Sequence, residues 1–227
     1  MRPWDLIDYE DVPDDDGTLF LVSRGSEYVI HVNGRELMSN RLHGSEDALA
    51  DFACDRLAEL DDARILVGGL GMGFTLAAAL RRVGPNARVT VAELLPAVVR
   101  WNREYCGRAS RHPLSDSRTE VYVGDVGDLV ETPPARWSAI LLDVDNGPGA
   151  LTRPNNGWLY TRHGLRSARD ALVPGGILGI WSARPDSALN SRLRKVGFEV
   201  EVLPFHEPGR PTHDDRGIDT LWMARRR

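Results

Sequence analysis

Short, nearly unbroken apolar runs alternate along most of the chain with segments whose apolar positions recur at helical spacing. The run at residues 65–67 is followed by an alanine-rich segment at 75–82, and the run at 89–92 by a segment from Pro96 to about Tyr105. Unbroken apolar runs are typical of strands buried on both faces of a parallel sheet. Strands that alternate with helices predict that the helices cover both faces of this sheet.

Further segments continue the pattern towards the end of the chain. Strands are expected at residues 121–123, 139–142, 177–181, 198–205 and 220–224. Helices are expected at residues 46–60, after Asp125, near 161–172 and at 187–195, with Ser45 as a candidate N-cap and Gly197 as the last stop. The sequence therefore predicts an α/β fold with a Rossmann-like, doubly wound, seven-stranded sheet.

The first part of the chain has a different pattern. Residues 1–17 are acidic and rich in turn formers, and we expect a loosely ordered lead-in there. Three strands are expected, at residues 19–23, 27–32 and 35–39. Asn33-Gly34 is a strong hairpin signal, because both residues tolerate positive φ. We therefore predict an N-terminal β-hairpin module at residues 1–44 and a larger domain at residues 45–227.

Glycines follow the first strand of the larger domain directly. They are Gly68, Gly69, Gly71 and Gly73, and a helical segment begins after them. A strand, a glycine bend and a helix open a nucleotide-binding βαβ unit. The dinucleotide fingerprint would need a glycine where Phe74 stands, and no lysine followed by serine or threonine marks a phosphate-binding loop. A glycine-rich turn without a ligand is the alternative.

Three expected strands in succession end at an acidic residue: Glu93, Asp125 and Asp143. Ligands of open α/β sheets bind at the carboxyl ends of the strands, so these acids are candidates for binding. Glu93 could accept hydrogen bonds from both hydroxyls of a ribose. The alternative is that each acid only caps the helix after it, because carboxylates stabilise helix N-termini.

Composition narrows the choice of partners and compartment. The net charge is −5, and no basic run precedes the terminal arginines 225–227, which disfavours a nucleic-acid partner. Cys54 and Cys106 form no C-x-x-C pair, and the six histidines have no metal-ligand spacing, so we expect no metal. We see no signal peptide and no apolar run long enough to span a membrane, and we predict a cytoplasmic protein without a membrane partner.

These motifs resemble those of class I S-adenosylmethionine-dependent transferases, over roughly residues 62–224. The resemblance implies that the glycine bend lies against the amino-acid end of the cofactor, that Glu93 holds the ribose and that Asp125 bonds the adenine amine. The Pro-Gly-Gly turn at 174–176 is also similar to the family. The implied cofactor-binding residues are Gly68, Gly69, Gly71, Gly73, Glu93, Leu94, Gly124, Asp125, Val126 and Asp143.

A closer resemblance is to the spermidine synthase (aminopropyltransferase) family, on the Asn33-Gly34 hairpin, the glycine bend and the acid-rich loop after Asp143. It implies that Asp143, together with Asp145, is catalytic and helps to deprotonate an attacking amine. The second acid of the family's pair falls at Asn146. The family's acid within the glycine bend falls at Gly71, its hairpin glutamine at Leu37, and its Tyr-His-Glu stretch is absent.

The resemblance implies a transferase that uses S-adenosylmethionine or its decarboxylated form as co-substrate. An aminopropyl or a methyl group would pass to a small-molecule nucleophile, with an amine as one candidate. The loop at 146–156 could shape the acceptor pocket or lie at the surface, and Trp158 and Tyr160 could line that pocket or begin a packed helix. A non-catalytic binding or assembly protein with the same fold is the alternative. An exposed edge of the N-terminal hairpin could pair two subunits into a homodimer.

Overall fold

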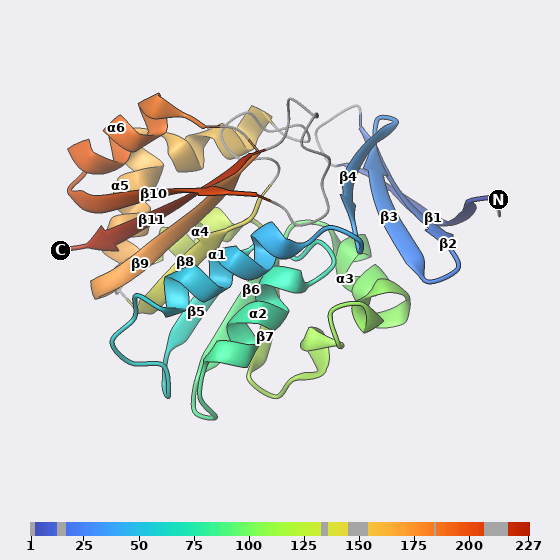
Figure 1. The fold of residues 1–227 in the computed structure, drawn as a ribbon, viewed down its shortest axis with the longest axis horizontal. Helices are drawn as coiled ribbons and strands as arrows, with labels where there is room; N and C mark the ends of the chain where they lie inside the picture. The colour runs from blue at the N-terminus through green and yellow to red at the C-terminus, as the bar shows by residue number, and fades with distance from the viewer. Residues whose placement is uncertain (1–2, 13–16, 133–135, 145–153, 184, 207–217) are drawn as a thin grey trace.

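The structure, a computed structural model, describes residues 3–12, 17–132, 136–144, 154–183, 185–206 and 218–227. Its strands form two sheets, one of four strands and one of seven (Figure 1). The larger sheet has the order β10-β11-β9-β8-β5-β6-β7. Its strands are β5 (Arg64–Gly68), β6 (Arg88–Glu93), β7 (Thr119–Val123), β8 (Trp137–Leu142), β9 (Leu172–Ser182), β10 (Phe198–Phe205) and β11 (Asp219–Arg226).

Six strands of the larger sheet run in one direction, and β11 runs antiparallel to them between β9 and β10. Successive residues of β5 point to opposite faces: Ile65 and Val67 pack in one core, and Leu66 packs in the other. All three side chains are fully buried. This is the alternation that a sheet covered on both faces requires, and the predicted doubly wound α/β fold is confirmed.

The helices divide between the two faces. The core that contains Ile65 includes apolar residues of α1 (Gly44–Cys54), α2 (Phe74–Arg82) and α3 (Pro96–Glu104). The core that contains Leu66 includes residues of α4 (Val126–Val130), α5 (Arg162–Ala171) and α6 (Ser187–Lys195). Short 3-10 segments lie at Cys106–Arg108, Pro113–Ser115 and Pro154–Tyr160. None of the helices in the described part of the chain is long and apolar enough to cross a membrane.

The smaller sheet contains β1 (Asp5–Asp11), β2 (Thr18–Arg24), β3 (Glu27–Val32) and β4 (Arg35–Ser39), all antiparallel. The three expected strands are confirmed. The expectation of a loosely ordered lead-in is wrong for residues 5–11, which pair along β2 as a fourth strand. The acidic side chains hid this strand, because acidic residues are uncommon in strands.

Asp8 of β1 joins the smaller sheet to α3. Its Oδ2 accepts hydrogen bonds from Trp101 Nε1 at 2.8 Å and from the Arg100 guanidinium at 2.7 Å. Both bonds lower the pKa of the Asp8 carboxyl below its ordinary value, and the bond from Arg100 has the larger effect. The smaller sheet is therefore attached to the helix that follows β6.

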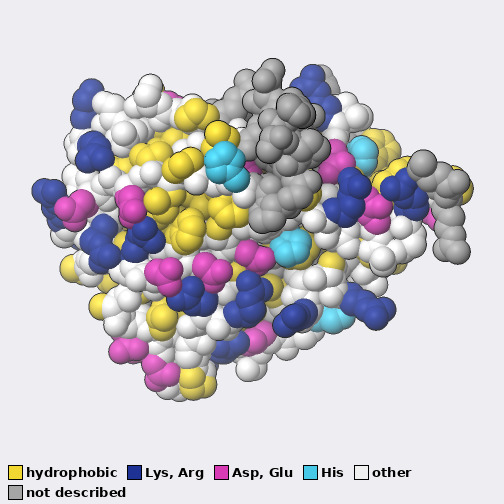
Figure 2. Space-filling view, in the orientation of Figure 1, with side chains coloured by type: hydrophobic (Ala, Val, Ile, Leu, Met, Phe, Trp, Pro, Cys, Tyr) yellow, Lys and Arg dark blue, Asp and Glu magenta, His cyan; other side chains and the backbone are white. Residues whose placement is uncertain are grey.

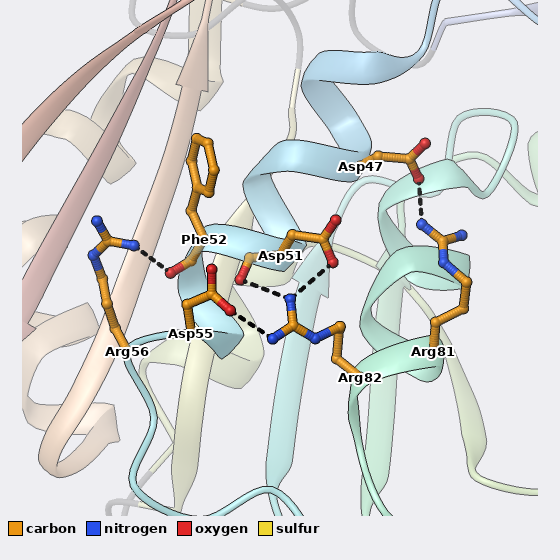
Figure 3. Close-up of polar contacts among 7 residues, drawn as sticks. All are labelled: Asp47, Asp51, Phe52, Asp55, Arg56, Arg81 and Arg82. Carbon is orange, nitrogen blue, oxygen red and sulfur yellow. Dashed lines mark hydrogen bonds and ion pairs between the residues drawn. The ribbon is translucent and has the colours of Figure 1, made fainter.

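Helices α1 and α2 are joined by ion pairs on the surface (Figure 3). Arg82 of α2 lies between Asp51 and Asp55 of α1, and Arg81 pairs with Asp47. Figure 2 shows the same region as a row of acidic side chains over α1 beside basic side chains over α2. Figure 1 shows both helices in front of the larger sheet.

Some expected boundaries were wrong. Helix α1 ends at Cys54 instead of residue 60, because the amides of Arg56 and Leu57 bond three residues back and tighten the chain into turns. Its N-cap is His43, and Ser45 lies inside the helix. Strand β9 begins at Leu172, so the Pro-Gly-Gly stretch lies within the strand, where the register against β8 shifts.

Candidate active site at the carboxyl edge of the sheet

The glycine bend connects β5 to α2 at the edge where the parallel strands end. Gly69, Gly71 and Gly73 all have positive φ, at +90°, +48° and +84°. A Cβ at Gly69 would collide with the backbone oxygen of Asp143, at the end of the neighbouring strand β8. The bend therefore needs glycine both for its backbone conformation and for its close approach to β8.

Glu93 ends β6 and is held against the bend. Its Oε2 accepts the Leu70 amide at 3.0 Å and its Oε1 accepts the Leu95 amide at 2.9 Å. The residue is 9% exposed. Each carboxylate oxygen can accept more than one hydrogen bond, so these two amides do not exhaust its capacity for hydroxyl donors. The structure thus brings Glu93 and the glycine bend together, and Leu94 lies between Glu93 and its second donor.

Asp125 follows β7 and is the N-cap of α4. Its Oδ1 accepts the Gly127 amide at 2.8 Å, which satisfies a helix N-terminal donor and leaves Oδ2 outside that bond. The next residue, Val126, lies against Gly68, where an added Cβ would meet its side chain at 3.0 Å. Asp125 therefore caps α4 through Oδ1, and its role in binding a ligand stays a prediction. Gly124 precedes it, and its amide bonds the Glu93 carbonyl.

Asp143 follows β8, and its amide bonds the Gly68 carbonyl at 2.9 Å. Its Oδ2 accepts the Thr75 hydroxyl at 2.6 Å. Burial raises the pKa of the Asp143 carboxyl from 3.8 to about 6, the Thr75 bond opposes that rise, and the nearby Asp219 carboxyl adds to it. A carboxyl with a pKa near 6 can take up and release a proton close to neutral pH.

Asp219 and Thr75 are two residues that sequence reasoning missed. Asp219 is fully buried at the start of β11, and the next residue, Thr220, pairs with Ser182 at the end of β9. Because β11 is antiparallel, its beginning lies at the edge where the parallel strands end. Antiparallel closure of the sheet was the signal that could have placed Asp219 there. Nothing in the local sequence singled out Thr75 from an alanine-rich helix.

Two other expectations have different outcomes. Asp145, the second predicted catalytic acid, and most of the loop at 146–156 lie outside the described residues. Trp158 and Tyr160 follow the packing alternative: Tyr160 is 1% exposed in the core, and the Trp158 ring lies against Gly127 of α4. In the parts of the chain that the structure describes, no three histidine, cysteine, aspartate or glutamate residues lie together as a metal site.

Comparisons with known proteins address the fold first. No family model matches the chain. The crystal structure of spermidine synthase from Thermotoga maritima superposes with a TM-score of 0.77 at 18% identity, over 98% of this chain and 73% of that chain. Spermidine synthase in complex with the transition state analogue AdoDATO gives a TM-score of 0.76 at 17% identity, over 98% and 72%. Likeness at this level of identity shows the shared fold.

Sequence comparison finds curated relatives that share one name. The polyamine aminopropyltransferase of Nitrosomonas europaea is 32% identical over 126 residues, 55% of this chain and 37% of that protein. The polyamine aminopropyltransferase of Sulfolobus acidocaldarius is 27% identical over 135 residues, 58% of this chain and 42% of that protein. The resemblance to the spermidine synthase-like family is confirmed. The matched segments span less than half the length of these curated relatives.

Proposed function

We propose that the chain is an aminopropyltransferase-like enzyme that binds a sulfonium nucleoside and transfers its aminopropyl group to a small amine. One observation carries the proposal: Glu93, the glycine bend and Asp143 meet at one edge of the sheet. The co-substrate is decarboxylated S-adenosylmethionine, and methyl transfer from S-adenosylmethionine is the variant that the sequence left open. The glycine bend of residues 68–73 and its neighbours would hold the co-substrate.

The described residues fit a nucleoside at this edge. Glu93 offers the oxygens of a carboxylate fixed by two backbone amides, which suits the hydroxyls of a ribose. Asp125 offers Oδ2, which suits an exocyclic amine of a base. The glycines at 69 and 71 are partly exposed and have no side chain to keep a ligand from the backbone.

The reaction requires the protein to position the reactants and to accept one proton. The amine nitrogen attacks the carbon next to the sulfonium, a C–N bond forms, and the C–S bond breaks to leave a neutral thioether. The new ammonium then gives a proton to a base. Asp143 is suited to that step, because its pKa of about 6 leaves it deprotonated at neutral pH, and its nearness to the bend places it beside the reacting groups.

Calorimetry tests the binding step. Wild-type protein should bind decarboxylated S-adenosylmethionine and methylthioadenosine, and Glu93→Ala should weaken both by tenfold or more. A matched control is Glu199→Ala, an exposed acid of β10 at the opposite edge of the sheet. Absence of binding by the wild-type protein, or equal losses in both variants, would refute the proposal.

Mass spectrometry of amine acceptors after incubation with each co-substrate decides which group is transferred. A gain of an aminopropyl group supports the main proposal, and a gain of a methyl group supports the variant. A folded protein that binds the nucleosides and transfers neither group would be the non-catalytic relative. The division at residues 44 and 45, a homodimer and a cytoplasmic location stay predictions.

A further inference from the structure

Met38 of β4 lies over the glycine bend of the larger sheet. A Cβ built on Gly71 would meet two heavy atoms of the described residues within 4 Å, the Sδ of Met38 at 2.7 Å and its Cε still closer. Met38 is partly buried, as is Gly71. The thioether thus occupies the space that a side chain at position 71 would need.

A β-bulge sets the direction of Met38. Ile30 of β3 pairs with Met38 and His31 pairs with Glu36, so Leu37 is an extra residue on β4. A bulge bends its strand and re-aims the side chains beside it. The placement of Met38 therefore comes from the backbone of the smaller sheet.

The bend cannot easily move away from Met38. The Gly71 carbonyl accepts a hydrogen bond from the Asn102 side chain of α3, and Asn102 is 2% exposed. The Gly73 amide bonds the Leu70 carbonyl at 2.7 Å, and Leu70 itself donates to Glu93. The backbone at position 71 is thus held by a hydrogen bond from α3, and Met38 covers the space where its side chain would lie.

Charge is distributed unevenly along this bend. Glu93 lies at Leu70 and Asp143 at Gly69, whereas the groups described around Gly71 are a thioether and an amide. An ammonium group that leaves water needs a carboxylate partner, and a thioether is only a weak acceptor. Among the described residues, the side of the bend at Gly71 is therefore suited to an apolar or neutral group, and it offers no ion pair to a cationic one.

We propose that Met38 sets how the site recognises the tail of its co-substrate: it fills the side-chain space beside Gly71, so the tail meets a thioether there and its amine finds no ion pair among the described residues. This inference rests on the proposed function of the same site. The wild-type protein then discriminates less than tenfold between S-adenosylmethionine and its decarboxylated form. Those two ligands share the amine and differ in one carboxylate.

Two substitutions together should make the site select between its ligands by charge. Aspartate tolerates left-handed backbone better than most residues, so Gly71→Asp is acceptable for the backbone once Met38 no longer blocks it. Gly71→Asp alone should weaken all nucleosides, because the new side chain collides with Met38. Met38→Ala with Gly71→Asp should restore methylthioadenosine binding and favour the decarboxylated ligand by tenfold or more, since the introduced carboxylate would attract its amine and repel the carboxylate of S-adenosylmethionine.

Calorimetry with methylthioadenosine, S-adenosylmethionine and its decarboxylated form measures these ratios, and thermal melting checks that each variant is folded. Met38→Ala with Gly71→Asn is the uncharged control, which should bind methylthioadenosine without the new preference. Met38→Leu keeps the apolar filling and should keep the wild-type ratio.

The outcomes distinguish a failure of this inference from a failure of the proposed function. If the double variant with Gly71→Asp binds methylthioadenosine but keeps the wild-type ratio, the role of Met38 is overturned and the proposed function still stands. A wild-type preference above tenfold for the decarboxylated ligand would overturn it as well. Wild-type protein that binds none of the three ligands would overturn both.

Discussion

Glu93 and Asp143 end two strands of the same sheet and are held in opposite ways. Glu93 accepts two backbone amides, which fix its carboxylate against the glycine bend. Asp143 accepts the Thr75 hydroxyl, is partly buried and lies near a second acid. Burial and that acid favour the neutral form. The same kind of side chain is thus suited to holding a ligand at one strand end and to taking a proton at the other.

The largest expected effect comes from removing the proton acceptor. Asp143→Asn should lower aminopropyl transfer by about a hundredfold or more, the usual contribution of a positioned base. Methylthioadenosine affinity should stay within about threefold, because the amide keeps the shape of the site. Single-turnover kinetics and calorimetry measure the two effects, with the exposed Asp170→Asn as the control. A variant that loses affinity but keeps turnover would reverse the roles of the two acids.

The pH dependence tests the difference in protonation. Transfer should rise with pH through a midpoint near 6, because the Asp143 carboxyl has to lose its proton before it can accept one, and its pKa is about 6.

The folded form also binds this proton more tightly than the unfolded chain does. The contribution of Asp143 to stability is therefore present below pH 3.8 and is lost as pH rises to about 6. Chemical denaturation from about pH 3.5 to about pH 7 should show this decline in the wild type and not in Asp143→Asn.

A smaller effect is expected from Thr75, whose hydroxyl lowers the pKa of Asp143. Thr75→Val keeps the shape and removes this donor. The midpoint of the pH–rate profile should move upward by about one unit, since a bond to a charged group is worth about 1.5 kcal/mol. An unchanged or lower midpoint would mean that the Thr75 bond does not act on the reacting carboxylate.

The smallest effect is expected for acids that neither hold the ligand nor accept the proton, and replacing their common partner Arg82 tests this. Asp51 and Asp55 are partly exposed partners of Arg82 on the surface of α1 and α2 (Figure 3). Arg82→Ala should lower the free energy of unfolding by about 1 kcal/mol or less and leave transfer unchanged, because solvent screens these pairs. Denaturation at low and at high salt should show the loss shrinking as salt rises.

The sequence predicted the larger sheet well because each strand contains its own signal. Apolar runs in β5, β6 and β8 and glycine or proline at the turns are local features, and the strand-end acids followed from them. β1 was missed because its acidic residues oppose strand propensity, and only pairing with β2 stabilises it. Asp219 was missed because its place depends on the antiparallel pairing of β11 with β9, which the local pattern of β11 alone does not give. Met38 could not be found, since no local pattern encodes the bulge beside it.

Three consecutive residues of α3 make contacts with two different parts of the chain. Arg100 and Trp101 grip Asp8 of the smaller sheet, and Asn102 holds the Gly71 carbonyl. One turn of helix α3 therefore connects β1 to the backbone of the glycine bend. A change in the way β1 is held would reach position 71 through these side chains.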